Sequence, residues 1–222
     1  MDLQGRTRTM NDLAEGDAGM EVRGCQASPR LFRNPLLDRL SRVNHLVPLF
    51  LYSPIAVFLV WLALRSMSVH SVIAGALAGY LAWTLVEYFG HRFLFHYRPQ
   101  TASGRRVQFL LHGVHHEYPG DPLRLVMPPL MSVPIIVAAF AVLRLVCGPE
   151  LVMPVLAGFI GGYVGYDMLH FHVHHGRPRT WLGKLLRHRH MHHHFRDESS
   201  WFGVSAPWWD DILRTQPDKA VR

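Results

Sequence analysis

The stretch EYFGHRFLFH, residues 87–96, directly follows an apolar run and carries histidines at positions 91 and 96. Three more histidine-rich stretches come later: LHGVHH (residues 111–116), YDMLHFHVHH (166–175) and HMHHHF (190–195). The pattern H-x-x-H-H occurs in two of them. Residues three and four positions apart share one face of a helix. These stretches therefore predict helices that each present two or three imidazoles toward one place.

Ten of the 16 histidines fit this spacing. Ten neutral nitrogen donors suit two ions of the iron or zinc type better than one ion. The alternatives are ordinary core and surface histidines or a loose metal-binding tail, but chance rarely produces H-x-x-H-H twice in one short chain. His45 and His70 stand alone, and His172, His175, His188 and His192 break the spacing, so these six carry no predicted role. The predicted metal ligands are His91, His96, His112, His115, His116, His170, His174, His190, His193 and His194.

Four apolar stretches approach the length needed to cross a bilayer, which takes about 20 helical residues. They cover residues 46–64, 69–86, 128–146 and 151–169, and none has a charge in its middle. Buried helices of a soluble protein are the alternative, but such helices usually keep a polar face. The sequence therefore predicts an all-α integral membrane protein with four transmembrane helices in two hairpins.

The basic residues, which give the chain a formal net charge of +7, are unevenly placed along this topology. With a cytoplasmic N-terminus, Arg65 and Arg144 fall in the outer turns and the other 21 of 23 Lys and Arg lie inside. This distribution follows the positive-inside rule and puts all four histidine stretches on the cytosolic side. We expect the cytoplasmic membrane in a bacterium or the endoplasmic reticulum membrane in a eukaryote. The basic surface then faces the membrane, and the sequence contains no motif that indicates nucleic-acid binding.

The remaining segments predict a simple domain order. Residues 1–28 lack a hydrophobic period and are expected to be disordered. Residues 29–45 alternate leucines with arginines, which indicates an amphipathic helix on the inner membrane surface; a solvated linker is the alternative. Residues 46–215 form the main domain, its cytosolic helical cap is made of residues 91–127 and 170–215, and residues 216–222 are a tail.

Two carboxylates, Glu87 and Asp167, each lie one turn ahead of a predicted ligand histidine. Neutral imidazole ligands would leave about +4 on two ferrous ions, which the local electrostatics must accommodate. We hypothesise that each carboxylate accepts a ring N–H from a nearby ligand, which fixes the tautomer and offsets the charge. A salt bridge with Arg92 or Arg177 at the helix end is the alternative.

The stretches EYFGHRFLFH, FLLHGVHHEYPGDPLRLVMPP, GYDMLHFHVHH, HMHHHF and FGVSAPWWD closely resemble the fatty acid hydroxylase superfamily, nearest its fatty acid 2-hydroxylases. The resemblance covers residues 28–215. It implies four membrane helices capped by a cytosolic helical domain that holds a dimetal centre, with the ten histidines above as ligands. Members of the family are described as iron-dependent, and zinc can occupy the equivalent positions.

The resemblance also implies an activity: a membrane di-iron monooxygenase of lipid biosynthesis that uses O2 to hydroxylate a lipid acyl chain at C2. No side chain supplies an oxidant for an unactivated C–H bond, so iron is the expected working metal. Tyr88, Phe93, Phe95 and Tyr166 are candidate walls of the substrate pocket, with ordinary packing as the alternative. Many relatives carry a fused cytochrome b5 domain. This chain contains no haem-binding HPGG sequence, so we expect a separate electron donor of the cytochrome b5 or ferredoxin type.

Two other functions stay open at this point. Another lipid oxidase of the same superfamily would act on a sterol, a carotenoid or a lipid headgroup. A non-enzymatic metal-binding or metal-transport membrane protein belongs to a different class. Transporter sites lie near the bilayer midplane, whereas these histidines lie at one end of the predicted spans, and this placement disfavours transport.

Overall fold

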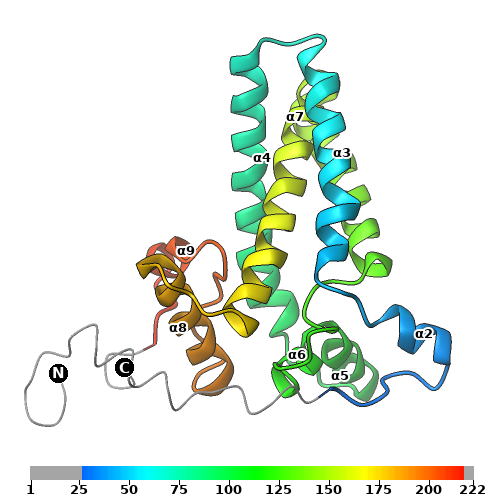
Figure 1. The fold of residues 1–222 in the computed structure, drawn as a ribbon, viewed down its shortest axis with the longest axis vertical. Coiled ribbons are helices and arrows are strands. Elements are labelled where there is room, and N and C mark those ends of the chain that lie inside the picture. Colours follow the sequence, from blue (N-terminus) through cyan, green and yellow to red (C-terminus); the bar gives the residue numbers. More distant parts are fainter. Residues whose placement is uncertain (1–26, 218–222) are drawn as a thin grey trace, which may run out of the picture.

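The computed structural model describes residues 27–217, which form helices and contain no strand. Three long helices stand side by side, and the shorter helices gather at one end of them (Figure 1). Two of the short elements are π-helices, which the histidine spacing did not predict. In chain order the elements are α2 (Pro35–Leu40), α3 (Leu46–Leu64), α4 (Val69–Phe89), a π-helix (Gly90–Phe95), α5 (Ala102–Gln108), a second π-helix (Phe109–Gly113), α6 (Val114–Glu117), α7 (Pro129–His175), α8 (Trp181–Phe195) and α9 (Trp208–Ile212).

Three helices in the described range are long and apolar enough to cross a membrane: Leu46–Leu64, Val69–Phe95 and Pro129–His175. The first two contain the stretches predicted at 46–64 and 69–86. The stretches predicted at 128–146 and 151–169 both fall on α7, and this helix is interrupted at Gly148, where φ is 79° and ψ is 176°. Figure 1 shows the two halves of α7 running in opposite directions on either side of this interruption.

Glycines allow the long helices to approach closely. A Cβ atom on Gly79 of α4 would lie 1.8 Å from the carbonyl oxygen of Val155 on α7. A Cβ atom on Gly158 of α7 would lie 1.8 Å from the carbonyl oxygen of Ala76 on α4. Small residues permit such contact between membrane helices because no side chain separates the two backbones. The α4 and α7 backbones therefore pack directly against each other at these positions.

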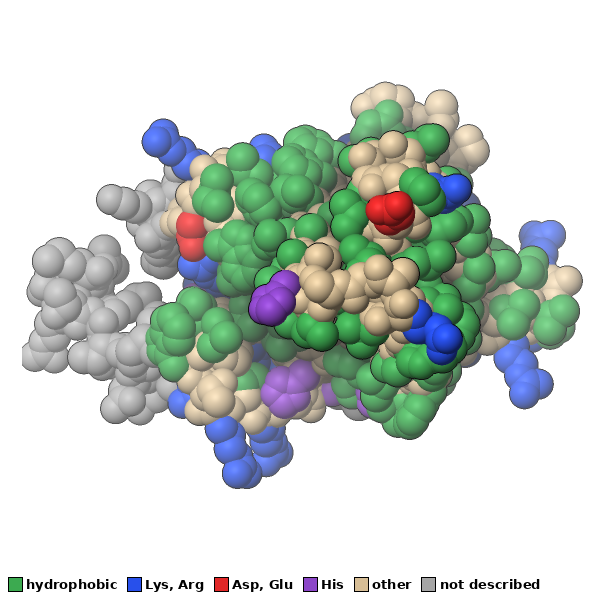
Figure 2. All heavy atoms as spheres, turned by 90° about the horizontal axis from the view of Figure 1, so that it is seen from above, with side chains coloured by type: hydrophobic (Ala, Val, Ile, Leu, Met, Phe, Trp, Pro, Cys, Tyr) green, Lys and Arg blue, Asp and Glu red, His purple; other side chains and the backbone are tan. Residues whose placement is uncertain are grey.

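The buried core between the long helices is aromatic. The Trp83 ring packs edge-on against Phe159 and at a tilt against Tyr163, with ring centroids 5.4 and 5.2 Å apart. The hydroxyl groups of Tyr52 and Ser132 lie 2.6 Å apart and tie α3 to the first half of α7. Many large apolar side chains point outward instead, and in the view from above most of the bundle surface is hydrophobic (Figure 2). This exterior is the surface that acyl chains would cover.

The segment ahead of α3 is anchored by a group of charged side chains. Asn34 caps α2 by accepting hydrogen bonds from the two amides that follow Pro35, while Leu36 and Leu40 are exposed. The predicted amphipathic helix over residues 29–45 is therefore a single short helix, Pro35–Leu40. Ser28 is buried and donates from its amide and its hydroxyl to Asp121. The predicted disordered segment otherwise lies outside the described residues, as do residues 218–222 of the predicted tail.

The loop between α8 and α9 is fixed from two sides. The Asp210 carboxylate accepts the amides of Phe202 and Gly203 at 2.8 and 2.9 Å. The Glu87 carboxylate at the end of α4 accepts the amide of Ser205 at 2.7 Å and its hydroxyl. These contacts hold the carbonyl groups of this loop in fixed positions beside the histidines.

Candidate metal centre

The structure brings the ten predicted ligand histidines together in two groups of five. Within each group, one ring nitrogen from every histidine lies within 4.8 Å of the others. Every histidine is buried except two partly exposed members of group one. Group one is His91, His96, His112, His116 and His193, and group two is His115, His170, His174, His190 and His194.

Each H-x-x-H-H motif contributes to both groups. In the first motif, His112 and His116 join group one and His115 joins group two. The second motif reverses this division: its outer histidines belong to group two and His193 belongs to group one. Consecutive residues on an α-helix point about 100° apart, so the last two histidines of a motif face different places. The prediction that all three rings of a motif point toward one place is therefore wrong.

The five-residue separation of His91 and His96 works because the chain between them is π-helical. The amide of His96 donates to the carbonyl of His91 at 3.2 Å, the i→i+5 bond of a π-helix. In an α-helix the two side chains would point about 140° apart, whereas here their Nε2 atoms lie 3.2 Å apart. Short π-helical segments are frequent at functional sites. Gly90 begins the first π-helix, and Gly113 ends the second.

Backbone carbonyls set the tautomer of two histidines in group one. Nδ1 of His91 lies 2.6 Å from the carbonyl of Phe202, and Nδ1 of His193 lies 2.7 Å from the carbonyl of Ser200. A carbonyl only accepts, so each Nδ1 carries the proton and each Nε2 presents a lone pair. Nε2 of His91 nevertheless lies 3.1 Å from Nε2 of His112. Nε2 of His112 also lies 3.0 Å from Nε2 of His116. One N–H on His112 cannot serve both contacts, so a shared cation explains this convergence better than hydrogen bonding does.

Group two shows the same convergence in a fully buried setting. Nε2 of His190 lies 2.9, 2.8 and 3.1 Å from the Nε2 atoms of His170, His174 and His194. One imidazole N–H can serve one such contact at most, so hydrogen bonds cannot account for all three. The donor set is neutral nitrogen throughout, which is typical of iron and zinc sites.

The two groups adjoin each other. The rings of His116 in group one and His194 in group two are stacked, with centroids 4.2 Å apart. Group one also reaches the surface of the cap through His96 and His116. There the ring of His116 lies 3.7 Å from the exposed carboxylate of Glu198.

Burial keeps these imidazoles neutral. Desolvation, with the charges of neighbouring histidines added, lowers the pKa of His96 and of His115 from 6.5 to about 3. The same causes lower the pKa of His116 to about 2 and hold the pKa values of His112, His190, His193 and His194 well below 6.5. A metal ligand must be unprotonated, so at neutral pH the cap histidines are in the form that binds metal.

Acidification is therefore expected to release metal and to destabilise the fold together. The unfolded chain takes up protons on these histidines near pH 6.5, whereas the folded chain does not. Stability is present above that pH and is lost as the pH falls below it, and metal binding sharpens the loss because protons compete for the ligands. Thermal unfolding and metal content measured together from pH 7.5 to pH 4 test this. A melting temperature that stays flat while metal is lost would contradict the coupling.

The two predicted carboxylate partners contact other groups. Glu87 binds the amide and hydroxyl of Ser205, and Asp167 interacts with Tyr163 and the amide of Met127. Among the described residues, neither carboxylate forms a hydrogen bond or salt bridge with a histidine or arginine. The geometry gives the orienting role in group one to the carbonyls of Phe202 and Ser200, which no side-chain pattern reveals. Glu87 supports the loop that carries these carbonyls through its hydrogen bonds with Ser205.

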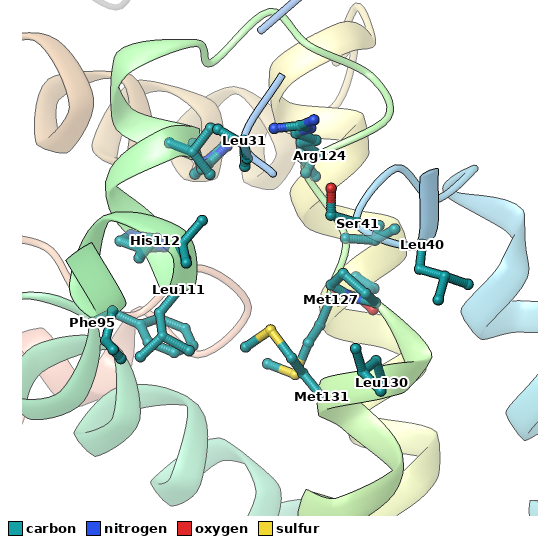
Figure 3. Close-up of a pocket in the computed structure, with 18 of the residues that line it drawn as sticks. Leu31, Leu40, Ser41, Phe95, Leu111, His112, Arg124, Met127, Leu130 and Met131 are labelled. Atoms are coloured by element: carbon teal, nitrogen blue, oxygen red, sulfur yellow. The ribbon is translucent and has the colours of Figure 1, made fainter. Parts of the chain in front are cut away.

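An apolar cavity of about 340 Å³ borders both groups, since its walls include His112, His115 and His170. Figure 3 shows His112 and Phe95 on one side and Ser41 and Arg124 on the other. Half of the remaining wall residues come from α2, the second π-helix and the segment that leads into α7.

Two of the four predicted pocket residues, Phe95 and Tyr166, line this cavity. The hydroxyl of Tyr88 instead lies 2.8 Å from that of Thr215, and Phe93 is 60% exposed. The wall residues that were missed include Leu111, Met127 and Met131. Leu111 lies in the stretch FLLHGVHH and Met127 in RLVMPP, so these two stretches were the signal in the sequence for two of the three.

Comparison with known proteins gives consistent matches. Residues 76–215 match the family model described as fatty acid hydroxylase. The chain is 32% identical over 194 residues to dihydroceramide fatty acyl 2-hydroxylase FAH2 of Arabidopsis thaliana, covering 87% of this chain and 82% of that protein. It is 36% identical over 211 residues to fatty acid 2-hydroxylase of Rattus norvegicus, covering 84% of this chain and 56% of the rat protein.

A solved structure supports the fold. The structure described as "Full length scs7p (only hydroxylase domain visible)" superimposes with a TM-score of 0.80 at 32% sequence identity. The match covers 86% of this chain and 73% of that one.

Proposed function

Because the chain belongs to the fatty acid hydroxylase family, we propose that it is a membrane-bound di-iron monooxygenase that hydroxylates lipid acyl chains at C2. Two similar proteins are named for 2-hydroxylation of fatty acids or of fatty acyl groups in dihydroceramide. The observation that carries the proposal is the apolar cavity whose walls include histidines of both groups. Such a cavity accepts a hydrocarbon chain and places one of its carbons beside the proposed centre.

The ten histidines are the proposed ligands of two iron ions, five to each ion. Bound iron supplies electron transfer to O2, a chemistry that side chains lack and that redox-silent zinc would not provide. The protein contributes orientation and exclusion of water. The carbonyls of Phe202 and Ser200 keep the Nδ1 protons of His91 and His193 in place, so that both Nε2 atoms point inward. The apolar wall keeps water from competing with the acyl chain.

We infer four membrane crossings in two hairpins. A continuous helix of 47 residues would be about 70 Å long, more than twice the roughly 30 Å of a bilayer core. Folding back at Gly148 turns α7 into two spans beside α3 and α4. The histidine groups then lie on the cytosolic side, where the positive-inside rule places the basic residues.

Electrons would come from a separate protein on that side, of the cytochrome b5 or ferredoxin type. His96 and His116 are the histidines of the centre that reach the surface of the cap. We propose this edge as the surface that the external donor contacts.

Mass spectrometry of lipids from a host that expresses the chain tests the proposal. The wild type is expected to add one oxygen to acyl chains, with fragmentation placing it on C2, and the His115→Ala variant is expected to add none. The two are compared at equal protein level in the membrane. Oxygen found instead on a sterol, a carotenoid or a headgroup would redirect the assignment to another lipid oxidase. No new oxygen, with the donor and iron supplied, would overturn it.

A further inference from the structure

Besides histidines, the wall of the cavity includes an acidic side chain, Asp167, and a basic one, Arg124. This residue is 7% exposed, and one of its terminal nitrogens, Nη2, donates to Asp38 at 2.9 Å. The other two nitrogens, Nε and Nη1, are buried and have no hydrogen-bond partner among residues 27–217. Buried donors without a partner are costly, so this arrangement indicates an acceptor that arrives with a ligand.

The surroundings of Arg124 show which kind of acceptor fits. Asp38 and Asp121 face Arg124 and Arg42, so the group carries no net charge at neutral pH. Asp38 is already occupied, since it also accepts from the amide of Leu31 at 2.7 Å and from Arg42 at 3.3 Å. Each of these free guanidinium donors, at the edge of an apolar cavity, can donate to a carbonyl or carboxylate oxygen.

We propose that Arg124 is a positioning residue that hydrogen-bonds the carbonyl oxygen of the acyl substrate. This rests on the proposed function and adds a reason for its regiochemistry. C2 is bonded to the carbonyl carbon, so holding the carbonyl prevents the chain from sliding past the histidines. The apolar tail then lies among Met127, Leu130 and Met131 at the start of α7 (Figure 3). A hydrocarbon without a carbonyl would gain nothing from the guanidinium.

The same carbonyl chemistry occurs in a free fatty acid and in an N-acylated sphingoid base. Binding is measured with octadecanoic acid, N-octadecanoyl sphinganine and octadecane, using the wild-type protein and variants in lipid nanodiscs. Arg124→Gln is expected to weaken binding of one or both carbonyl probes by about tenfold to a hundredfold, the usual loss for a hydrogen bond to a charged group. Octadecane binding is expected to stay unchanged. The carbonyl probe that is weakened identifies the source.

Arg42→Gln is the matched control. It makes the same chemical change in the same charge group, but Arg42 contacts Asp38, Asp121 and the carbonyl of Ser28 and does not line the cavity. It is expected to lower stability and to leave probe binding near wild type. Arg124→Lys, which keeps the charge without the planar fork, is expected to give an intermediate loss. The Arg124→Lys variant also replaces Arg124→Gln in the binding measurement if Arg124→Gln does not fold.

Turnover provides a second readout. With iron and a donor supplied, Arg124→Gln is expected to raise KM and to yield product hydroxylated at C3 beside C2, while Arg42→Gln yields C2 product alone. Equal probe binding and equal product patterns in the two glutamine variants would overturn the role of Arg124. A wild-type protein that hydroxylates no acyl chain would overturn the proposed function instead, so the two failures are distinguishable.

Discussion

Replacing His170 by alanine is expected to abolish acyl-chain hydroxylation, whereas replacing His172 is expected to leave it near the wild-type rate. His170 is buried in group two, and its Nε2 lies 2.9 Å from Nε2 of His190. His172 lies two residues further along the same helix and is exposed. Loss of an outer partner of a ligand typically costs about 10- to 100-fold, so loss of a ligand itself should cost at least about a hundredfold.

Metal content separates this effect from misfolding. His170→Ala is expected to retain group one and to bind about half of the wild-type iron, because the two groups share no histidine. Elemental analysis of purified protein gives the ratio of metal to chain, and lipid mass spectrometry gives the product. Full iron content and normal product in His170→Ala would refute the assignment of group two. Equal losses of iron and product in His172→Ala would show that any substitution at this end of α7 disturbs the site, so that the effect is not specific to a metal ligand.

Gly158→Ala is expected to destabilise the bundle strongly. Among single Gly→Ala changes at the α4–α7 contact, only Gly79→Ala is expected to have a comparable effect. The added Cβ would lie 1.8 Å from the carbonyl oxygen of Ala76. A backbone atom cannot rotate away as a side chain can, so the two helices must separate. Overpacking typically costs about 1–3 kcal/mol and occasionally more, and we expect the upper end, about 3 kcal/mol.

Gly161 supplies the control on the same helix. A Cβ there meets no other atom within 4 Å, so Gly161→Ala should be neutral or slightly stabilising. The measurement is the temperature at which each detergent-solubilised variant loses its monodisperse elution peak. We expect a fall of roughly 6–12 °C for Gly158→Ala. Equal behaviour of the two variants would mean that α4 and α7 do not pack as closely as described.

The helices could be predicted from local sequence patterns because helix formation depends on residues close together in the chain. Hydropathy alone located α3 at Leu46–Leu64 and the start of α4 at Val69. The spacing of the histidines selected the same ten residues that the structure gathers, out of 16 in the chain. Their role as metal ligands remains a prediction, but their proximity does not depend on it.

Side-chain partners were harder to predict because they depend on segments far apart in the chain. Glu87 and Asp167 were expected to contact histidines because a predicted ligand histidine lies one helical turn after each of them in the chain. Glu87 instead meets Ser205, which is brought beside it by the loop between α8 and α9. The group that orients His91 is a backbone carbonyl, at Phe202. A carbonyl is present at every residue, so no sequence pattern singles one out.

The sequence by itself determined which residues form apolar helices and which histidines can share a helix face, because both follow from periodicity within a few turns. The tertiary structure alone decided how the ten histidines divide into two groups. His115 and His193 each belong to a different group from the other two histidines of their own H-x-x-H-H motif. The tertiary structure also decided that Arg124 borders the cavity with two free donors. These outcomes depend on how α6, α8 and the N-terminal segment pack on the ends of the long helices, and that packing is set by contacts between residues distant in the chain.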